Sequence, residues 1–209
     1  MNRYPILLRR RLPDEREATL LIDTIPTLEA LLEESNIADI HSIADFGAES
    51  RRRERLAWRV MLRDYLGREA EIEYLPSGKP LLRDEEYSHI SVSHCKDLVS
   101  VAISHRECGV DIERLDRRFE AVAERYMSPQ EIRMSSEPLL RAVVWSAKEV
   151  LYKMAGREAL DLRENIRIEH IDTSQREVEG VVISEKQELL RCRLSYYQPD
   201  EEHILLYYL

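Results

Sequence analysis

Two acidic side chains, Asp111 and Glu113, flank one apolar residue in the segment Gly109-Val110-Asp111-Ile112-Glu113. In a β-strand alternate side chains share a face, so both carboxylates point the same way while Val110 and Ile112 point to the core. Such a pair is half of a site for a hard cation such as Mg²⁺, but paired carboxylates on a strand are often only solvated. The segment alone leaves both interpretations open.

A second polar group falls on one face of a long predicted helix, residues 139–155. At about 100° per residue, one face of this helix is an apolar stripe that must be buried: Leu139, Leu140, Val143, Val144, Ala147, Val150, Leu151 and Met154. The opposite face carries Trp145, Lys148, Glu149, Tyr152 and Lys153. An exposed Glu149–Lys153 pair, worth about 0.2–0.5 kcal/mol, would explain the charges. It would not explain the two aromatic residues, which favour a covered polar cleft.

A third set of residues is basic and lies in a predicted helix at 49–66: Arg51, Arg52, Arg53, Arg55 and Arg59. Arginines on a helix most often form a solvated face. The formal net charge is −9, so the whole surface is not typical of nucleic-acid-binding proteins, and we expect no nucleic-acid partner. An anionic ligand would need a local basic pocket.

In combination, these segments resemble the paired signature of the 4′-phosphopantetheinyl transferases. The family pattern G-[IV]-D-x-E matches residues 109–113, and W-[ST]-x-K-E-[AV]-x-x-K matches residues 145–153. Upstream, Gly78-Lys79-Pro80 and Ile90-Ser91-Val92-Ser93-His94 resemble the family's G-K-P and [IV]-S-x-S-H segments. The helix that includes Arg53 and Arg59, with its R-x-x-L-A-x-R pattern, resembles the family's basic helix. The resemblance covers roughly residues 52–160 in four ordered blocks.

The resemblance implies a magnesium-dependent transferase that moves the 4′-phosphopantetheine arm of coenzyme A onto a serine of an apo acyl carrier protein, or of a carrier domain of a polyketide or peptide synthetase. Adenosine 3′,5′-bisphosphate would be released. Asp111, Glu113 and Glu149 are the implied ligands of Mg²⁺, which grips the pyrophosphate. Glu149, directly or through a water, would take the serine proton, and Lys153 would reach a phosphate.

The resemblance also implies residues for the 3′-phosphate end of coenzyme A. These are Lys79, His94 and a helix arginine, with Arg53 as the first choice and Arg59 as its support. Two departures from the family pattern stand out. Cys95 replaces the commoner serine or threonine after the histidine, and it is a weaker hydrogen-bond donor. Residues 157–160 lack the basic or glycine-rich character that is commoner after Gly156.

The elements expected to position these residues form an α+β pattern rather than alternating βαβ units. Helices are predicted at 27–35, 49–66, around 119–126, after the capping box at Ser128-Pro129-Gln130-Glu131, and at 139–155. Strands are predicted at 70–75, 90–94, 98–104, 109–113, 166–171, 178–184, 189–197 and 203–208. Gly67 is placed to end its helix in a left-handed cap.

The tetrapeptide Gly-Arg-Glu-Ala occurs at 67–70 and again at 156–159, each time after a long helix and before strands. We therefore expect two pseudo-symmetric halves, 1–104 and 105–209. Each would be a long helix packed on a small, mainly antiparallel sheet, with the site at their interface. This organisation resembles the larger, surfactin-synthetase-activating type of transferase, in which one chain supplies both halves, so we expect a monomer.

The remaining sequence features favour the cytoplasm. The apolar run Ile6-Leu7-Leu8 is too short for a signal peptide or a membrane span. Cys95, Cys108 and Cys192 form no C-x-x-C pair, which argues against a disulfide scaffold or a zinc site. Two other functions stay open at this stage: a different magnesium phosphotransferase or nuclease, and a non-catalytic module that binds carrier proteins.

Overall fold

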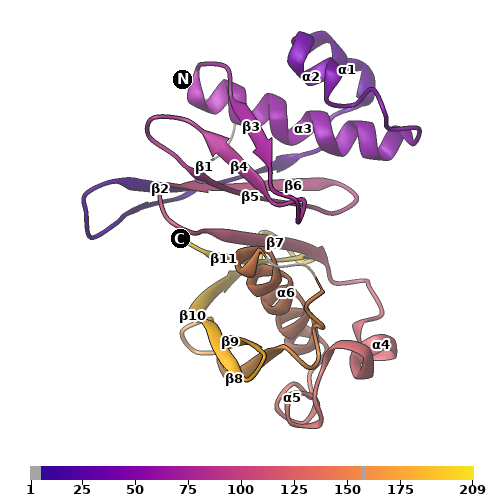
Figure 1. The fold of residues 1–209 in the computed structure, drawn as a ribbon. Helices are drawn as coiled ribbons and strands as arrows, with labels where there is room; N and C mark the ends of the chain where they lie inside the picture. The colour runs from indigo at the N-terminus through magenta and orange to yellow at the C-terminus, as the bar shows by residue number, and fades with distance from the viewer. Residues whose placement is uncertain (1–5, 157–158) are drawn as a thin grey trace.

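The computed structural model describes residues 6–156 and 159–209, and it contains one antiparallel sheet in each half of the chain (Figure 1). The first sheet has the strand order β1-β2-β6-β5-β4-β3. Its strands are β1 Ile6–Arg11, β2 Glu17–Thr24, β3 Glu71–Tyr74, β4 Pro80–Arg83, β5 His89–His94 and β6 Leu98–Ser104. The second sheet has the order β7-β11-β10-β9-β8. Its strands are β7 Gly109–Arg114, β8 Ile166–Asp172, β9 Glu177–Ser184, β10 Gln187–Tyr197 and β11 His203–Tyr208.

Six helices accompany the two sheets in the described residues. They are α1 Leu28–Glu34, α2 Ile37–His41, α3 Glu49–Leu66, α4 Phe119–Tyr126, α5 Pro129–Met134 and α6 Pro138–Ala155. The two longest, α3 and α6, have 18 residues each. Both end at a glycine in the left-handed region, Gly67 at φ 66° and Gly156 at φ 58°, which a residue without Cβ adopts at no steric cost. The predicted α+β fold is confirmed.

The first sheet lies between α3 and the strands β7 and β11 of the second sheet, whereas β8, β9 and β10 lie further from the first half, around α6 (Figure 1). Alternation along the strands explains this arrangement. In β2, Leu21 packs with the α3 cluster, whereas its neighbour Leu20 packs with Val110 and Ile112 of β7. The interior between the two sheets therefore joins the halves through a shared apolar core.

Strand β7 turns its other face toward α6. Gly109 marks this close approach, because a Cβ added there would lie 2.7 Å from Cγ1 of Val150. Asp111 and Glu113 share the face of Gly109, since they follow it at intervals of two. The two carboxylates consequently lie under α6, and Asp111 is only 4% exposed.

Four elements have no counterpart among the predicted ones: β1, β2, β4 and α2. In β1 the three arginines that follow the apolar run obscure the strand pattern, although β2 beside it is buried along most of its length. The predicted boundary between 104 and 105 stays a prediction; it falls in the connection between β6 and β7. Arg157 and Glu158, in the segment that departs from the family pattern, lie outside the described residues. Within the described ranges, none of the helices has both the length and the apolar character needed to cross a membrane.

Candidate active site

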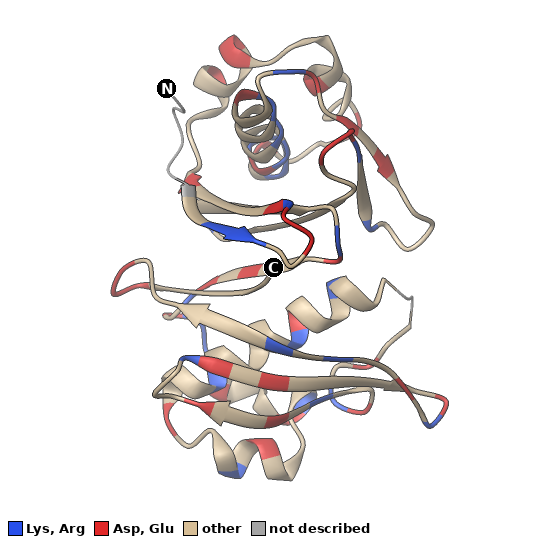
Figure 2. Cartoon of the chain, turned by 90° about the vertical axis from the view of Figure 1, so that its left-hand side faces the viewer, with Lys and Arg blue, Asp and Glu red and all other residues tan. Residues whose placement is uncertain are grey.

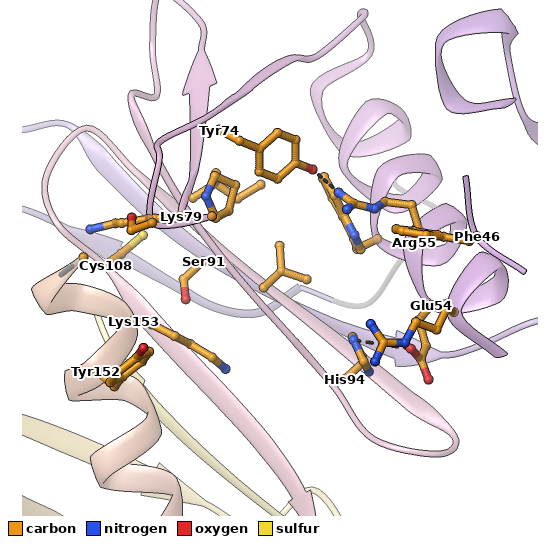
Figure 3. Close-up of a pocket in the computed structure, with 18 of the residues that line it drawn as sticks. Phe46, Glu54, Arg55, Tyr74, Lys79, Ser91, His94, Cys108, Tyr152 and Lys153 are labelled. Carbon is orange, nitrogen blue, oxygen red and sulfur yellow. Dashed lines mark hydrogen bonds and ion pairs between the residues drawn. The ribbon is translucent and has the colours of Figure 1, made fainter. Parts of the chain in front are cut away.

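A cavity of about 670 Å³ lies between the two halves of the chain. Its walls come from α3, from the turn between β3 and β4, from β5 and from the end of α6 (Figure 3). The charged and imidazole side chains among the described lining residues are Arg51, Glu54, Arg55, Lys79, His94 and Lys153. Neither half encloses this space alone.

The cavity wall is positively charged although the chain as a whole carries −9. Arg51 and Arg55 come from α3, whereas Lys79 and Lys153 come from the β3–β4 turn and from α6. Glu54 is the single acidic residue among the described lining residues. Elsewhere, Lys and Arg are interspersed with Asp and Glu over both halves (Figure 2). The local excess of cations favours an anionic ligand.

Lys79 ties the two halves together at the rim of the cavity. Its Nζ donates to Oε2 of Glu107 at 2.7 Å and to the carbonyl oxygen of Met154 in α6 at 3.1 Å. Gly156 is adjacent, and a Cβ there would lie 3.2 Å from Cδ of Lys79. The ammonium group is thus held where an anion entering the cavity would meet it.

Arg55 forms the aromatic part of the cavity wall together with Phe46, Trp58 and Tyr74. Its guanidinium carbon lies 5.3, 5.7 and 5.2 Å from the three ring centroids, and Nη1 donates to the Tyr74 hydroxyl. Figure 3 shows Arg55 and Tyr74 across the cavity from Lys153. Stacked flat groups of this kind offer a surface for a planar ring.

His94 ends β5 at the cavity wall, and its Nε2 lies 3.6 Å from Oε2 of Glu54. The enclosing walls limit hydration of the imidazolium, which lowers the pKa of His94, while the Glu54 carboxylate opposes this shift. The neighbouring Cys95 is not among the lining residues; its thiol points toward Asp97 and the carbonyl oxygen of Leu98. The substitution at position 95 therefore does not alter this wall directly.

The two helix arginines chosen from the sequence, Arg53 and Arg59, are not among the described residues that line the cavity. Arg53 donates from Nε to the carbonyl oxygen of Pro26 at 3.1 Å and from Nη2 to that of Ile25 at 3.2 Å. Arg59 bonds Oδ1 of Asp39 at 3.0 Å. One turn of helix brings Arg51 and Arg55 to the same face, whereas Arg53 is rotated by about 200° from Arg51.

Asp111 lies just beyond the cavity and is linked to it by Lys153. Oδ1 of Asp111 accepts hydrogen bonds from Ser93 Oγ and Lys153 Nζ, both at 2.8 Å. Lys153 Nζ also donates to the carbonyl oxygen of Val110 at 3.0 Å. Oδ2 of Asp111 is buried without a hydrogen-bond partner among the described residues. Burying a carboxylate oxygen without a partner costs free energy and is unusual in proteins, and a bound cation would remove this cost.

Glu113 is held by the tryptophan of the helix signature. Trp145 Nε1 donates to Oε1 of Glu113 at 2.7 Å, and Arg117 bonds the same oxygen. The Trp145 ring is fixed in turn by an edge contact with Tyr126, with centroids 5.0 Å apart. Burial raises the pKa of Glu113, and the nearby Asp111 carboxylate adds to the shift. The aromatic residue on the polar face of α6 thus orients a carboxylate.

Glu149 is the third carboxylate, and it projects from α6 between Trp145 and Lys153. Burial raises its pKa, as do the charges of Asp111 and then Glu113, while Lys153 lowers it. Among the described residues, no hydrogen bond or ion pair to its carboxylate is found. Its oxygens are free to take a cation or a proton.

The donor set formed by Asp111, Glu113 and Glu149 fits a hard divalent cation. All three supply carboxylate oxygens, which Mg²⁺ prefers, and one buried oxygen lacks a partner. Burial first, and then repulsion from the neighbouring carboxylates, raises the pKa of both glutamates, and a bound cation would relieve this repulsion. The carboxylates belong to the second half of the chain and border the cavity at Lys153.

Lys148 does not share this cleft, contrary to the helical-face analysis. Its side chain is fully buried, and Nζ bonds Glu131 at 2.9 Å and the carbonyl oxygens of Leu162 and Ile166 at 2.8 and 2.7 Å. Glu131 completes the predicted capping box with Ser128 and accepts the amide of Ile168. Lys148 and Glu131 therefore stabilise the second half and do not enter the cavity.

Two serines of the Ile90–His94 segment have a role that sequence reasoning missed. Ser91 Oγ accepts the amide of Val110 at 3.1 Å, and Ser93 Oγ accepts the amide of Ile112 at 3.2 Å. Ser93 also donates to Asp111. The signal was present in the sequence, because serines at an interval of two share one strand face. They fix β7, and with it the carboxylates, against the first half.

Comparisons with known proteins agree with the geometry. A family model described as the 4′-phosphopantetheinyl transferase superfamily matches residues 107–205, from just before β7 into β11. The 4′-phosphopantetheinyl transferase psf-1 of Bacillus pumilus is 33% identical over 87 residues, which cover 39% of this chain and 37% of that protein. The match thus spans little more than a third of that relative's length. The segment that the family model matches contains Asp111, Glu113, Glu149 and Lys153, so residues 107–205 of the chain are similar to the 4′-phosphopantetheinyl transferase superfamily.

Proposed function

We propose that the protein transfers the 4′-phosphopantetheine group of coenzyme A to a serine of an apo carrier protein and releases adenosine 3′,5′-bisphosphate. The observation that carries this proposal is the junction at Lys153, which lines the cationic cavity and bonds Asp111 of the carboxylate group. The match of residues 107–205 to the 4′-phosphopantetheinyl transferase superfamily and the name of the relative from Bacillus pumilus support the same chemistry.

Coenzyme A would occupy the cavity with its nucleotide end toward the first half. Its 3′-phosphate would meet Lys79, His94 and Arg51, and its adenine ring would lie near the aromatic wall around Arg55. Arg51 is exposed at the cavity, so it can turn toward a phosphate without breaking an existing bond. We infer that Arg51 and Arg55 supply the cationic wall expected of Arg53 and Arg59.

The pyrophosphate would lie at the carboxylate group of the second half. Asp111, Glu113 and Glu149 would hold Mg²⁺, which when bound neutralises negative charge on the pyrophosphate oxygens. Lys153 is already oriented by Asp111 and Val110, so its ammonium group stabilises charge on the same phosphates at little cost in reorganisation.

The reaction joins the serine Oγ of the carrier to the β-phosphorus of coenzyme A. The new Oγ–P bond forms as the P–O bond to the adenosine 3′,5′-bisphosphate group breaks. Glu149, directly or through one water, takes the serine proton. Its raised pKa makes it a stronger base than an ordinary glutamate, and its carboxylate has no other partner among the described residues, which leaves an oxygen available.

We also propose that the protein acts in the cytoplasm as a monomer. A single chain supplies both walls of the cavity, so the site is complete without a second copy. The carrier partner would be an acyl carrier protein or a carrier domain of a polyketide or peptide synthetase.

The test is incubation of the purified protein with coenzyme A, Mg²⁺ and a panel of apo carrier proteins from fatty-acid, polyketide and peptide synthesis. We expect at least one carrier to gain the mass of one phosphopantetheine group, with an equal amount of adenosine 3′,5′-bisphosphate released. The control is the same carrier with its acceptor serine replaced by alanine. Cleavage of coenzyme A without carrier modification would indicate another phosphotransferase or a hydrolase, and carrier binding without cleavage would indicate a non-catalytic module.

A further inference from the structure

A second group of potential metal ligands lies at the junction of the two halves, apart from the carboxylates under α6. Cys95 and Asp97 come from the turn between β5 and β6, and His203 begins β11. The Sγ of Cys95, one carboxylate oxygen of Asp97 and one ring nitrogen of His203 all lie within 4.8 Å of one another. Among the described residues, this is the one group of three or more such side chains gathered so closely.

The distances within this group suit a cation better than hydrogen bonds. Oδ1 of Asp97 lies 3.9 Å from Cys95 Sγ and 3.5 Å from His203 Nε2. Two ligands of one tetrahedral transition metal lie about 3.3–3.8 Å apart, given metal–ligand bonds of about 2.0–2.3 Å. Small side-chain movements would therefore close the three atoms around one ion.

His203 is oriented as a metal ligand. The residue is 3% exposed, and its Nε2 is buried without a hydrogen-bond partner among the described residues. Its Nδ1 bonds the Asp200 carboxylate at 2.8 and 2.9 Å, which favours the tautomer with the proton on Nδ1 and a lone pair on Nε2. A carboxylate behind the imidazole is the arrangement that fixes ligating histidines in metal sites.

The neighbouring charged side chain, Arg114, leaves one oxygen of Asp97 available to an ion. Arg114 Nη1 bonds Oδ2 of Asp97 at 2.8 Å, so Oδ1 remains for the cation. Cys95 and Asp97 are half-buried, which leaves a fourth position for water. Thiolate and imidazole ligands favour Zn²⁺ or a similar transition metal over Mg²⁺.

We propose that Cys95, Asp97 and His203 bind one transition-metal ion, Zn²⁺ being the best match, with Asp200 as the positioning residue. On binding, the thiol of Cys95 gives its proton to solvent and forms the metal–sulfur bond. The ion would join the β5–β6 turn of the first half to β11 of the second half. This site does not depend on the transferase activity proposed above.

The test uses the full chain, stripped of metals by a chelator and then titrated with Co²⁺ in the presence of saturating Mg²⁺. We expect one Co²⁺ per chain with the near-ultraviolet charge-transfer band of a cobalt-bound thiolate, and displacement by Zn²⁺. Cys95→Ser should abolish the band, whereas the matched control Cys192→Ser should keep it. Asp111→Asn should also keep it, because that carboxylate lies in the other site.

Two further variants keep the proposal testable if Cys95→Ser does not fold. His203→Gln should abolish tight binding, whereas His170→Gln, at an exposed position on β8, should not. Asp200→Asn should weaken Co²⁺ binding by about 10–100-fold and keep the thiolate band at high Co²⁺. Binding without a thiolate band, or a band that survives Cys95→Ser or His203→Gln in folded protein, would overturn the assignment.

Discussion

Helices α3 and α6 have the same length and the same glycine-terminated end, yet they present different chemistry to the cavity between them. From α3 come Arg51 and Arg55 among aromatic rings. From α6 come Lys153 and, beside the cavity, Glu149 facing the carboxylates of β7. Each helix packs its apolar face on the sheet of its own half.

This difference shows that the scaffold fixes where the two polar faces meet but not what they do. A face of guanidinium groups and rings suits the fixed charges of a nucleotide. A face with carboxylates of raised pKa and an oriented lysine suits bond making and breaking. We therefore propose that the first half mainly binds coenzyme A and that the second half mainly carries out the transfer, and the following variants test that division.

The largest effect is expected for Asp111→Asn. Asparagine keeps the shape of the side chain and an oxygen for Ser93, but removes the charge that bonds Lys153 and that would hold the cation. We predict a loss of turnover of at least about 100-fold at saturating Mg²⁺, the size typical of removing a preorganised electrostatic partner. Because Asp111 is buried, circular dichroism must show an intact fold. Asp45→Asn, at an exposed position, is the matched control, and near-normal turnover of Asp111→Asn would disprove the metal assignment.

A loss of about 100-fold is also expected for Glu149→Gln, but with a different dependence on Mg²⁺. Glutamine keeps one ligating oxygen and removes both the charge and the proton acceptor. We predict that the variant still binds coenzyme A, needs more Mg²⁺, and stays slow when Mg²⁺ saturates, because loss of a general base costs about 10²–10⁴-fold. Full recovery at high Mg²⁺ would show that another group or a water takes the serine proton.

A smaller effect, confined to binding, is expected in the first half. Lys79→Ala and His94→Ala should raise the KM for coenzyme A about tenfold, since a charge-assisted hydrogen bond contributes roughly 1.5–3 kcal/mol. The increase should be smaller for 3′-dephospho-coenzyme A. Arg53→Ala is the control, because Arg53 bonds the carbonyl oxygens of Ile25 and Pro26; it should lower Tm and leave KM unchanged. An equal rise in KM for both substrates would show that Lys79 and His94 do not contact the 3′-phosphate.

The smallest effect concerns stability without Mg²⁺. Burial and the Asp111 charge raise the folded-state pKa of Glu149 above its ordinary value of 4.5, so the fold disfavours its ionised form. The protonated carboxyl therefore contributes to the free energy of unfolding in full below pH 4.5. This contribution is lost as the pH rises through the pKa of the folded state, because Glu149 then ionises in its buried position. Glu149→Gln should therefore raise Tm at neutral pH, by about 2–4 °C for each 1 kcal/mol gained.

Differential scanning calorimetry of both proteins, without Mg²⁺ and as a function of pH, checks this prediction. The difference in Tm should shrink toward pH 4.5, and saturating Mg²⁺ should reverse its sign. A difference that does not change with pH would mean that the glutamate charge is not its cause.

The sequence predicted the parts of the molecule that depend on long periodic segments. The bounds of α3 agree with the prediction, and those of α6 differ by one residue, because an apolar stripe and a capping glycine define each helix. Asp111 and Glu113 fall on one strand face, as the alternation of side chains along a strand predicted. What the sequence did not settle was which way single polar side chains turn. Arg53 was chosen over Arg51, and Lys148 was placed in the cleft, because a helical projection does not show which neighbour covers each face.

The sequence patterns also did not predict contacts between segments that are distant in the chain. The cysteine spacing argued against a zinc site, yet Cys95 and Asp97 meet His203, more than 100 positions later, through the packing of β11 beside β7. Similarly, the interval of two places Ser91 and Ser93 on one strand face, but nothing local marked β7 as the strand that this face contacts. Such groups arise from tertiary packing, and motif spacing within one segment does not report them.

The division between the halves is tested most directly by Arg51→Ala and Glu149→Gln, measured side by side for coenzyme A affinity by calorimetry and for single-turnover transfer at saturating coenzyme A and Mg²⁺. We predict that Arg51→Ala weakens binding about tenfold and transfers at the wild-type rate once coenzyme A is bound. Glu149→Gln should bind coenzyme A nearly as wild type does and lose most of the single-turnover rate. If Arg51→Ala slows the bound reaction as much as Glu149→Gln does, the two halves do not divide binding from chemistry.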